Sequence, residues 1–111
     1  MIEERFKMSL ENVKSRMEDK MKFAPDLNAR YLFDFGDDGR LFLDASDSDA
    51  HVRILDDGEE PESDTTLACT LETFEGFLDG TGDPNIAYMT GKLKIRGGLG
   101  HAMKLNSVLE D

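Results

Sequence analysis

The 111-residue sequence contains one cysteine, no tryptophan and no long run of apolar residues. A lone cysteine excludes an internal disulfide, and the alternating run around Cys69 predicts a small side chain packed in a core. A membrane-spanning helix needs about 20 consecutive apolar residues, which this chain does not have. Glu3 and Glu4 stand where a secretion signal would be basic. We therefore expect a soluble, cytoplasmic protein with a single domain over residues 1–111.

Positive charge is scarce in the middle of the chain. The net charge is -11, and residues 23–91 hold three basic and seventeen acidic groups, a balance of -14. Residues 1–22 carry six basic and five acidic groups, and residues 92–111 carry four and two. Such an acidic segment repels phosphate groups at long range. We expect no nucleic acid partner and at most transient membrane contact.

The first 22 residues have helical periodicity. Apolar residues recur every three or four positions and fall on a narrow stripe, formed by Ile2, Phe6, Leu10, Val13, Met17 and Met21. Both charge signs occur on the polar face, which favours packing against a core over lying on a membrane surface. The sequence predicts an opening helix of about 20 residues.

Alternating apolar and polar residues predict five strands, within Tyr31–Phe35, Leu41–Ala45, Val52–Ile54, Thr65–Leu71 and Lys92–Arg96. Asp37, Asp38 and Gly39 supply a hairpin turn between the first two. The short links favour antiparallel neighbours among the first four strands. The predicted fold class is α+β, with a five-stranded, mostly antiparallel sheet whose helices cover one face.

Two short helices are predicted before the last strand. Phe74, Phe77 and Leu78 share one helical face, and Ile86 and Met89 share another after Pro84. After the last strand, Gly97 and Gly98 permit a sharp turn into a final helix, because glycine adopts backbone angles that other residues avoid.

The final helix carries more apolar surface than one sheet contact needs. On a helical wheel its apolar arc spans roughly 220°, about twice the usual breadth. The arc predicts a second buried side, covered by other helices, by a second copy of the chain or by an apolar ligand. Met89 and Met103 suit a ligand cavity because methionine is flexible. Asn106 lies inside the arc, where it would orient a ligand's head or cap a local backbone group.

Other motifs point to no particular chemistry. Asp47 and Asp49 lack the later residues of a calcium loop, and the glycine-rich turns lack nucleotide-binding spacing. His51 and His101 have no partner at zinc-ligand spacing. A small enzyme built on Cys69 or a serine stays an alternative with nothing specific to support it. We expect no catalytic residues, no metal and no cofactor.

The run from Asp83 to Gly97, followed by Gly100 to Leu105, closely resembles the signature of the sterol carrier protein type 2 family. The resemblance implies a five-stranded sheet covered by helices, with a hydrophobic tunnel. In that family the tunnel takes sterols, fatty acids, acyl-CoA esters or phospholipids without transforming them. The implied tunnel lining is Phe74, Phe77, Leu78, Ile86, Met89, Leu93, Ile95, Leu99, Met103 and Asn106.

The sequence departs from the family pattern at two places. It ends in Leu109-Glu110-Asp111 instead of a Ser-Lys-Leu-like tripeptide, which argues against peroxisomal import. His101 replaces an apolar residue often found there, at the edge of the arc. We expect a stand-alone prokaryotic member that carries an acyl chain, a phospholipid or an isoprenoid quinone. The alternative is an accessory lipid- or quinone-binding or protein-interaction module in an isoprenoid quinone or lipid biosynthetic assembly.

Overall fold

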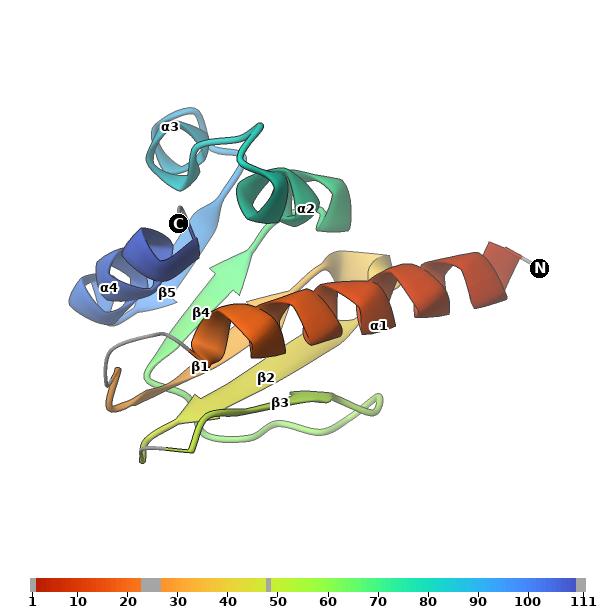
Figure 1. Ribbon diagram of the computed structural model, residues 1–111, viewed down its shortest axis with the longest axis horizontal. Helices are drawn as coiled ribbons and strands as arrows, with labels where there is room; N and C mark the ends of the chain where they lie inside the picture. Colours follow the sequence, from red (N-terminus) through yellow and green to blue (C-terminus); the bar gives the residue numbers. More distant parts are fainter. Residues whose placement is uncertain (1, 23–26, 48, 110–111) are drawn as a thin grey trace.

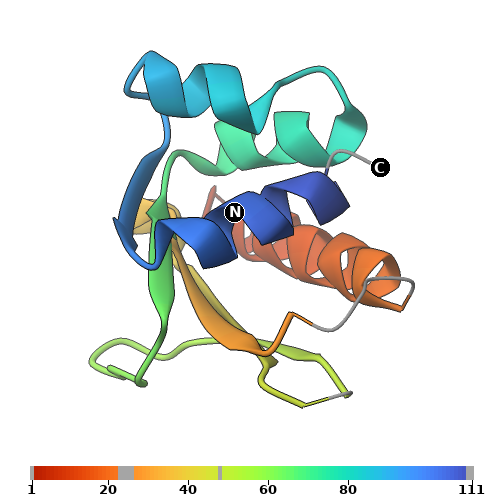
Figure 2. The same ribbon diagram turned by 90° about the vertical axis from the view of Figure 1, so that its left-hand side faces the viewer.

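A computed structural model describes the backbone of residues 2–22, 27–47 and 49–109. Side chains are described from residue 9 onward within these ranges. Five strands form one sheet in the order β3-β2-β1-β4-β5, with β1 at Ala29–Asp34, β2 at Arg40–Ala45, β3 at His51–Ile54, β4 at Thr65–Ala68 and β5 at Lys94–Gly97. The helices are α1 at Ile2–Met21, α2 at Leu71–Asp79, α3 at Pro84–Met89 and α4 at Leu99–Leu109. They cover one face of the sheet (Figures 1 and 2), which confirms the predicted class.

The sheet contains one parallel pair. Strand β4 pairs with β1 in parallel, with Phe33 opposite Leu67, whereas β1–β2, β2–β3 and β4–β5 are antiparallel. The prediction that the first four strands are all antiparallel neighbours is therefore wrong. Residues 55–64 carry the chain from β3 at one edge past β2 to the far side of β1. This connection is held at its two ends by Leu55 N donating to Arg40 O and Asp64 N donating to Arg30 O.

Helix α1 lies on the core as its periodicity predicts. The described part of its stripe, which comprises Leu10, Val13, Met17 and Met21, is buried. The side chains of Ile2 and Phe6 lie outside the described residues. Because Leu10, Val13, Met17 and Met21 pack against the protein's own core, this described part of the stripe is not available to a membrane surface.

Strand β4 ends earlier than predicted. It stops at Ala68, and the Thr70 hydroxyl accepts a hydrogen bond from Thr73 N at 3.1 Å, which caps α2. Such a cap satisfies a helix N–H that would otherwise have no partner. Leu71 is therefore the first residue of a helix rather than the end of a strand. Cys69 is partly buried and packs against the core, as expected.

The turn from β5 into α4 depends on glycine. Gly97 has φ +86°, and a Cβ built there would lie 2.6 Å from Asp64 O. A Cβ at Gly98 would lie 2.7 Å from the His101 ring. Strand β5 begins at Lys94 instead of Lys92, because Lys92 N and Leu93 N both donate to Ala87 O and close the end of α3.

Candidate functional site

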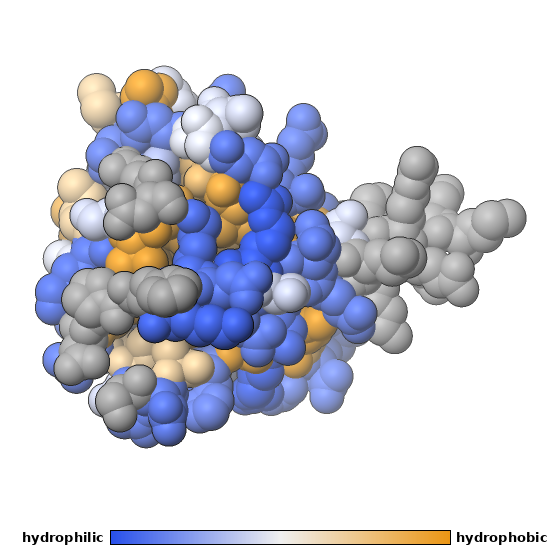
Figure 3. All heavy atoms as spheres, viewed as in Figure 1, coloured by the Kyte–Doolittle hydropathy of each residue, from blue (hydrophilic) through white to orange (hydrophobic). Residues whose placement is uncertain are grey.

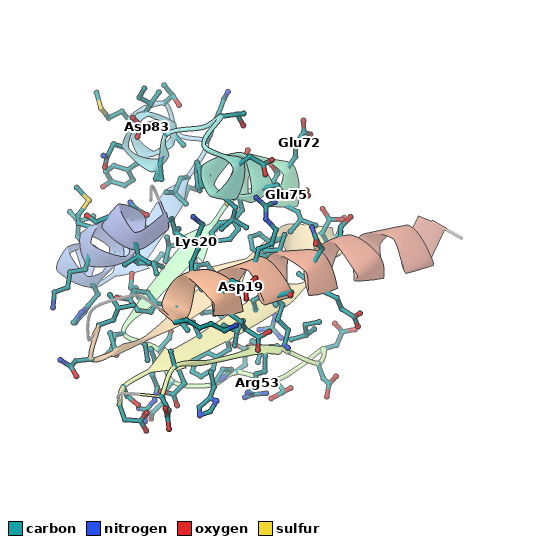
Figure 4. The ribbon with its side chains drawn as sticks, viewed as in Figure 1. Asp19, Lys20, Arg53, Glu72, Glu75 and Asp83 are labelled. Atoms are coloured by element: carbon teal, nitrogen blue, oxygen red, sulfur yellow. The ribbon has the colours of Figure 1, made fainter. Side chains whose placement is uncertain are left out.

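A cavity of about 780 Å³ opens between α2 and α3. Most of the surface that lines it is apolar, although polar side chains contribute to its rim. The lining residues are Thr70, Glu72, Thr73, Gly76, Phe77, Thr81, Gly82, Asp83, Ile86, Ala87, Thr90 and Lys92. Figure 4 shows Glu72 on α2 and Asp83 at the start of α3, on the two elements that face each other across this region. The volume lies within the range of about 300–1,000 Å³ that small-molecule sites occupy.

The loop between α2 and α3 shapes one end of the cavity. Gly80 ends α2 in a left-handed conformation with φ +80°, which glycine adopts without steric cost. Thr81 N and Gly82 N then both donate to Gly76 O at 3.0 Å. Asp83 caps α3 by accepting a hydrogen bond from Asn85 N at 2.8 Å. The loop therefore closes the C-terminal end of α2 at Gly80 and the N-terminal end of α3 at Asp83.

The cavity floor is continuous with the hydrophobic core. Phe77 lines the cavity and is also buried, and its ring meets the Phe74 ring at a centroid distance of 5.9 Å. Phe74 in turn contacts Phe33 and Phe35 of the β1 region, each at 5.3 Å between centroids. A hydrocarbon in the cavity would therefore rest on the edge of an aromatic cluster that reaches the sheet.

Helix α4 buries one side and exposes the other. Ala102, Leu105, Val108 and Leu109 are buried, whereas Leu99 is 46% and Met103 47% exposed. The protein's own helices therefore do not cover Leu99 and Met103, which leaves a second copy of the chain or an apolar ligand as the predicted cover for this side.

Asn106 lies in α4 beside this exposed side. It is only 3% exposed, and neither Oδ1 nor Nδ2 has a hydrogen-bond partner. The alternative that it caps a local backbone group therefore fails. A buried polar group without a hydrogen-bond partner lowers the stability of the fold by about 1–3 kcal/mol. The Asn106 amide carries this penalty as long as nothing binds to it.

The ten predicted tunnel residues fall into distinct groups. Phe74, Phe77, Leu78 and Leu93 belong to the core cluster, with Ile95 packed against it. Of the ten, Phe77 and Ile86 line the cavity. Met89 of α3 is 82% exposed and Ile86 is 59% exposed. The structure thus brings the α2 residues together in the core with Leu93 and Ile95. It leaves Ile86 and Met89 of α3 exposed, together with Leu99 and Met103 of α4.

Sequence reasoning missed the polar rim of the cavity. The threonines, Glu72 and Asp83 carry no apolar periodicity, which is the signal that points to the other site residues. Two helix-capping patterns, Thr70 with Thr73 and Asp83 before Pro84, mark the ends of the two helices that flank the cavity. Those patterns predict where the two helices begin, but they do not show that a cavity lies between them.

The described residues offer little for covalent or metal chemistry. Burial raises the pKa of the Cys69 thiol to about 12, so at neutral pH it is protonated and a weak nucleophile. Within the described ranges no group of three His, Cys, Asp or Glu side chains is placed to hold a metal ion. In the same ranges no helix is long and apolar enough to span a bilayer.

The family model described as the SCP-2 sterol transfer family matches residues 9–110. Among curated relatives, "Hydroxysteroid dehydrogenase-like protein 2" from Homo sapiens is 30% identical over 110 residues, covering 97% of this chain and 24% of that protein. The chain thus spans about a quarter of the length of the relative that it matches.

Solved structures share the fold. The crystal structure of Sterol Carrier Protein 2 Like 2 from Aedes aegypti aligns with a TM-score of 0.74 at 17% identity, covering 92% of this chain and 97% of that one. The solution structure of palmitated SCP2L2 from the same species has a TM-score of 0.67 at 18% identity and covers 93% and 92%. The "UbiJ-SCP2 Ubiquinone synthesis protein" has a TM-score of 0.64 at 13% identity and covers 89% and 86%. At these identities the likeness shows the fold alone.

Proposed function

The chain belongs to the SCP-2 sterol transfer family, and we propose that it binds and carries one lipid with a long hydrocarbon chain without transforming it. Membership of that family supports lipid binding or transfer as the general role. The partly buried, protonated Cys69 argues against thiol chemistry.

The cavity between α2 and α3 is the observation on which the proposal depends. Its floor of Phe77, Ile86 and Ala87 is apolar, while its rim is polar. A floor and rim of this kind suit a molecule with a hydrocarbon part and a polar part. Binding would be driven by removing apolar surface from water, at about 25 cal/mol per Å² before ordering costs.

The exposed apolar side chains extend this site toward α4. A guest chain that passed from the cavity between α3 and α4 would cover Ile86, Met89, Leu99 and Met103, which are now exposed. It would also bring a polar head to Asn106, whose amide offers one acceptor and two donor hydrogens without a partner. We therefore keep the ten predicted residues as the proposed contact surface, with Asn106 at its polar end.

A long-chain fatty acid is the first guest to test. The solution structure from Aedes aegypti is of a palmitated protein with the same fold. The carboxylate of palmitate is a hydrogen-bond acceptor, so it can accept from the Nδ2 group of Asn106, which has no partner. Palmitate is therefore our proposed probe, and the natural lipid belongs to the same chemical class of amphiphile.

A second candidate is an accessory lipid- or quinone-binding role in a biosynthetic assembly. The fold likeness to a ubiquinone synthesis protein supports it. The exposed Met89 and Ile86 favour it as well, since an assembly partner could cover them.

Native mass spectrometry of gently purified protein separates the two roles. A lipid mass retained at one per chain, and exchanged for added palmitate, supports the carrier. A retained protein subunit with no lipid supports the accessory role. Chain that carries neither, and that fails to take up palmitate, would refute the carrier proposal.

A further inference from the structure

Strand β5 is one of the two edges of the sheet, and part of its backbone has no strand to pair with. It pairs only with β4, in antiparallel direction. Gly98 N donates to Asp64 O at 2.9 Å, and the hydrogen-bonded residues of an antiparallel ladder alternate. Lys94 and Arg96 therefore direct their backbone groups to β4, whereas Ile95 directs its N–H and C=O away. Figure 2 shows no described element beyond β5 on that side.

The end of α3 uses one of the backbone groups that point away from β4. Leu93 N has the same orientation as Ile95 N, and it donates to Ala87 O at 3.0 Å. Within the described ranges no backbone carbonyl accepts from Ile95 N in this way. Unpaired donors and acceptors at the edge of a sheet are a template for another strand. The edge of β5 is therefore open from Ile95 onward.

The side chains of β5 divide between the two faces of the sheet. Ile95 lies opposite Leu67 and packs against the core, on the face that the helices cover. Lys94 and Arg96 lie on the other face, since side chains alternate along a strand. Both are exposed, and neither forms an ion pair with a described carboxylate. The open edge is therefore basic in a chain whose net charge is -11.

We propose that this open edge of β5 with Lys94 and Arg96, here called the basic edge, binds an acidic extended segment of a partner protein as an added strand. Strand addition draws affinity from main-chain hydrogen bonds and specificity from alternate side chains. In an antiparallel pairing, the partner residues opposite Lys94 and Arg96 would be aspartate or glutamate, because opposite charges across two strands attract. The residue between them would lie beside Ile95. The segment that fits is therefore acidic, apolar and acidic at successive positions.

The middle position of this segment suits an apolar side chain. Ile95 is only partly buried, so its own core leaves part of it in contact with water. The helices on this face expose apolar side chains as well, with Met89 of α3 82% and Leu99 of α4 46% exposed. Figure 3 shows hydrophobic atoms breaking the hydrophilic surface where α3 and α4 lie. An apolar partner residue beside Ile95 would complete its burial, which is favourable.

Charge distinguishes an acidic partner from a second copy of this chain. Two copies of β5 paired antiparallel about Ile95 would place Lys94 of one copy opposite Arg96 of the other. Like charges directly opposite each other destabilise a strand pair, and lysine on an edge strand opposes edge-to-edge association. The basic edge therefore rejects itself and accepts a strand of the opposite charge.

Strand β3, the other edge of the sheet, does not suit the same segment. By the same alternation Val52 directs its N–H to the free edge of β3. The Arg53 side chain already pairs with Glu59 at 2.8 Å. The connection that follows, residues 55–64, contains six acidic residues and no basic residue. An acidic segment is therefore repelled at β3 and attracted at β5.

The probe for the test is a short fluorescent peptide in which glutamate and valine alternate. A second peptide has lysine in place of glutamate, and a third keeps glutamate but has N-methylated valines, which cannot donate to the edge. The test variant is Lys94→Glu with Arg96→Glu. The matched control is Lys14→Glu with Lys22→Glu, which makes the same change in net charge within and directly after α1.

We expect the natural chain and the control variant to bind the glutamate peptide. The test variant should bind it at least about tenfold more weakly and should prefer the lysine peptide, because both cross-strand charge contacts change sign. This reversed preference also shows that the variant is folded. Bound glutamate peptide should slow hydrogen exchange of the Ile95 amide and leave that of Val52 unchanged. All variants should take up palmitate equally, so the result does not depend on the carrier role.

Four outcomes would overturn the proposal. They are a natural chain that does not bind the glutamate peptide, equal losses in the test and control variants, N-methylated peptide that binds as well as the unmodified one, and an Ile95 amide whose exchange does not slow.

Discussion

The phenol of Tyr31 donates a hydrogen bond to the backbone carbonyl of His101 at 2.9 Å, which ties β1 in the middle of the sheet to the first half of α4. Tyr31 is fully buried and His101 is partly buried, so this bond is largely shielded from bulk water. It fixes α4 at one end, while Leu99 and Met103 on the other side of the helix are exposed. A helix anchored in this way can adjust its exposed side without leaving the sheet.

Removing the phenol hydroxyl should loosen α4. Tyr31→Phe removes one hydrogen bond, and a typical bond contributes about 0.5–1.5 kcal/mol of net stability. We expect urea unfolding to show a loss of that size, and amide hydrogen exchange to speed up in α4. Tyr88→Phe, at a half-exposed position on α3, is the control and should change neither. Unchanged exchange in α4 would mean that the bond does not anchor the helix.

The same residue predicts how stability depends on alkaline pH. Burial, and then the nearby Asp64 charge, raise the pKa of Tyr31 from 10.0 to about 12. Between those values the unfolded state has lost the proton that the folded state keeps, so stability falls as pH rises. The loss should approach about 2–3 kcal/mol. In Tyr31→Phe this contribution disappears, and a pH series of urea unfolding from pH 9 to 12 should show a shallower decline than in the natural chain.

Gly97 and Gly100 form a matched pair of glycines. Gly97→Ala places a Cβ against Asp64 O, in a conformation with positive φ, and should destabilise the fold by roughly 1–3 kcal/mol. Gly100→Ala meets no atom within 4 Å and lies in α4, so it should stabilise by up to about 1 kcal/mol. Thermal unfolding of both variants checks the pair. Equal effects of the two substitutions would contradict the geometry of the turn.

Asn106→Leu should stabilise the empty protein and weaken binding of a lipid with a polar head. Leucine has a similar size and no polar atom, so the penalty of the unpartnered amide, about 1–3 kcal/mol, is removed. Binding of palmitate should weaken, while binding of a hydrocarbon without a head group should not. Calorimetric titration with both probes measures the difference. If palmitate binds the variant as tightly as the natural chain, Asn106 does not contact the head group.

Cys69 should react slowly with alkylating reagents. Its pKa of about 12 lies 3 pKa units above the ordinary value of 9.0, and the thiolate fraction falls tenfold per unit. Alkylation by iodoacetamide at pH 7.5 should therefore be about a thousandfold slower than for a free cysteine peptide. Mass spectrometry follows the reaction. A rate close to that of the peptide would show that the thiol is accessible and would reopen thiol chemistry.

Periodicity predicted most elements because core-facing residues repeat at fixed intervals. The α1 stripe and the alternation around Tyr31 and Phe33 gave correct helices and strands. Strand pairing was harder. The parallel pair of β1 and β4 depends on the path of residues 55–64, whose acidic composition has no periodicity to show where the chain goes. The pattern places the end of β4 too late because the alternation continues to Leu71, whereas the cap at Thr70 begins α2 there.

The site was predicted only in part, for a related reason. Phe74 and Phe77 were found because they are apolar and regularly spaced, but the same rule chose Met89 and Leu99, which the structure exposes. Spacing shows which residues share a face, and not what covers that face. The polar rim, including Glu72 and Lys92, arises from the fold of the α2–α3 loop and has no apolar signal in the sequence.

The central claim is that a hydrocarbon chain occupies the cavity between α2 and α3 and continues toward α4, and titration with a fluorescent fatty acid tests it most directly. Ile86→Trp places a larger side chain in the cavity, and Met103→Trp places one in the proposed extension toward α4. Tyr88→Trp is the control, because Tyr88 does not line the cavity. Circular dichroism checks that each variant folds. We predict saturable binding at one molecule per chain that Ile86→Trp and Met103→Trp each weaken at least tenfold and Tyr88→Trp leaves unchanged, since a filled site excludes its guest. Equal binding by all four proteins would contradict the account.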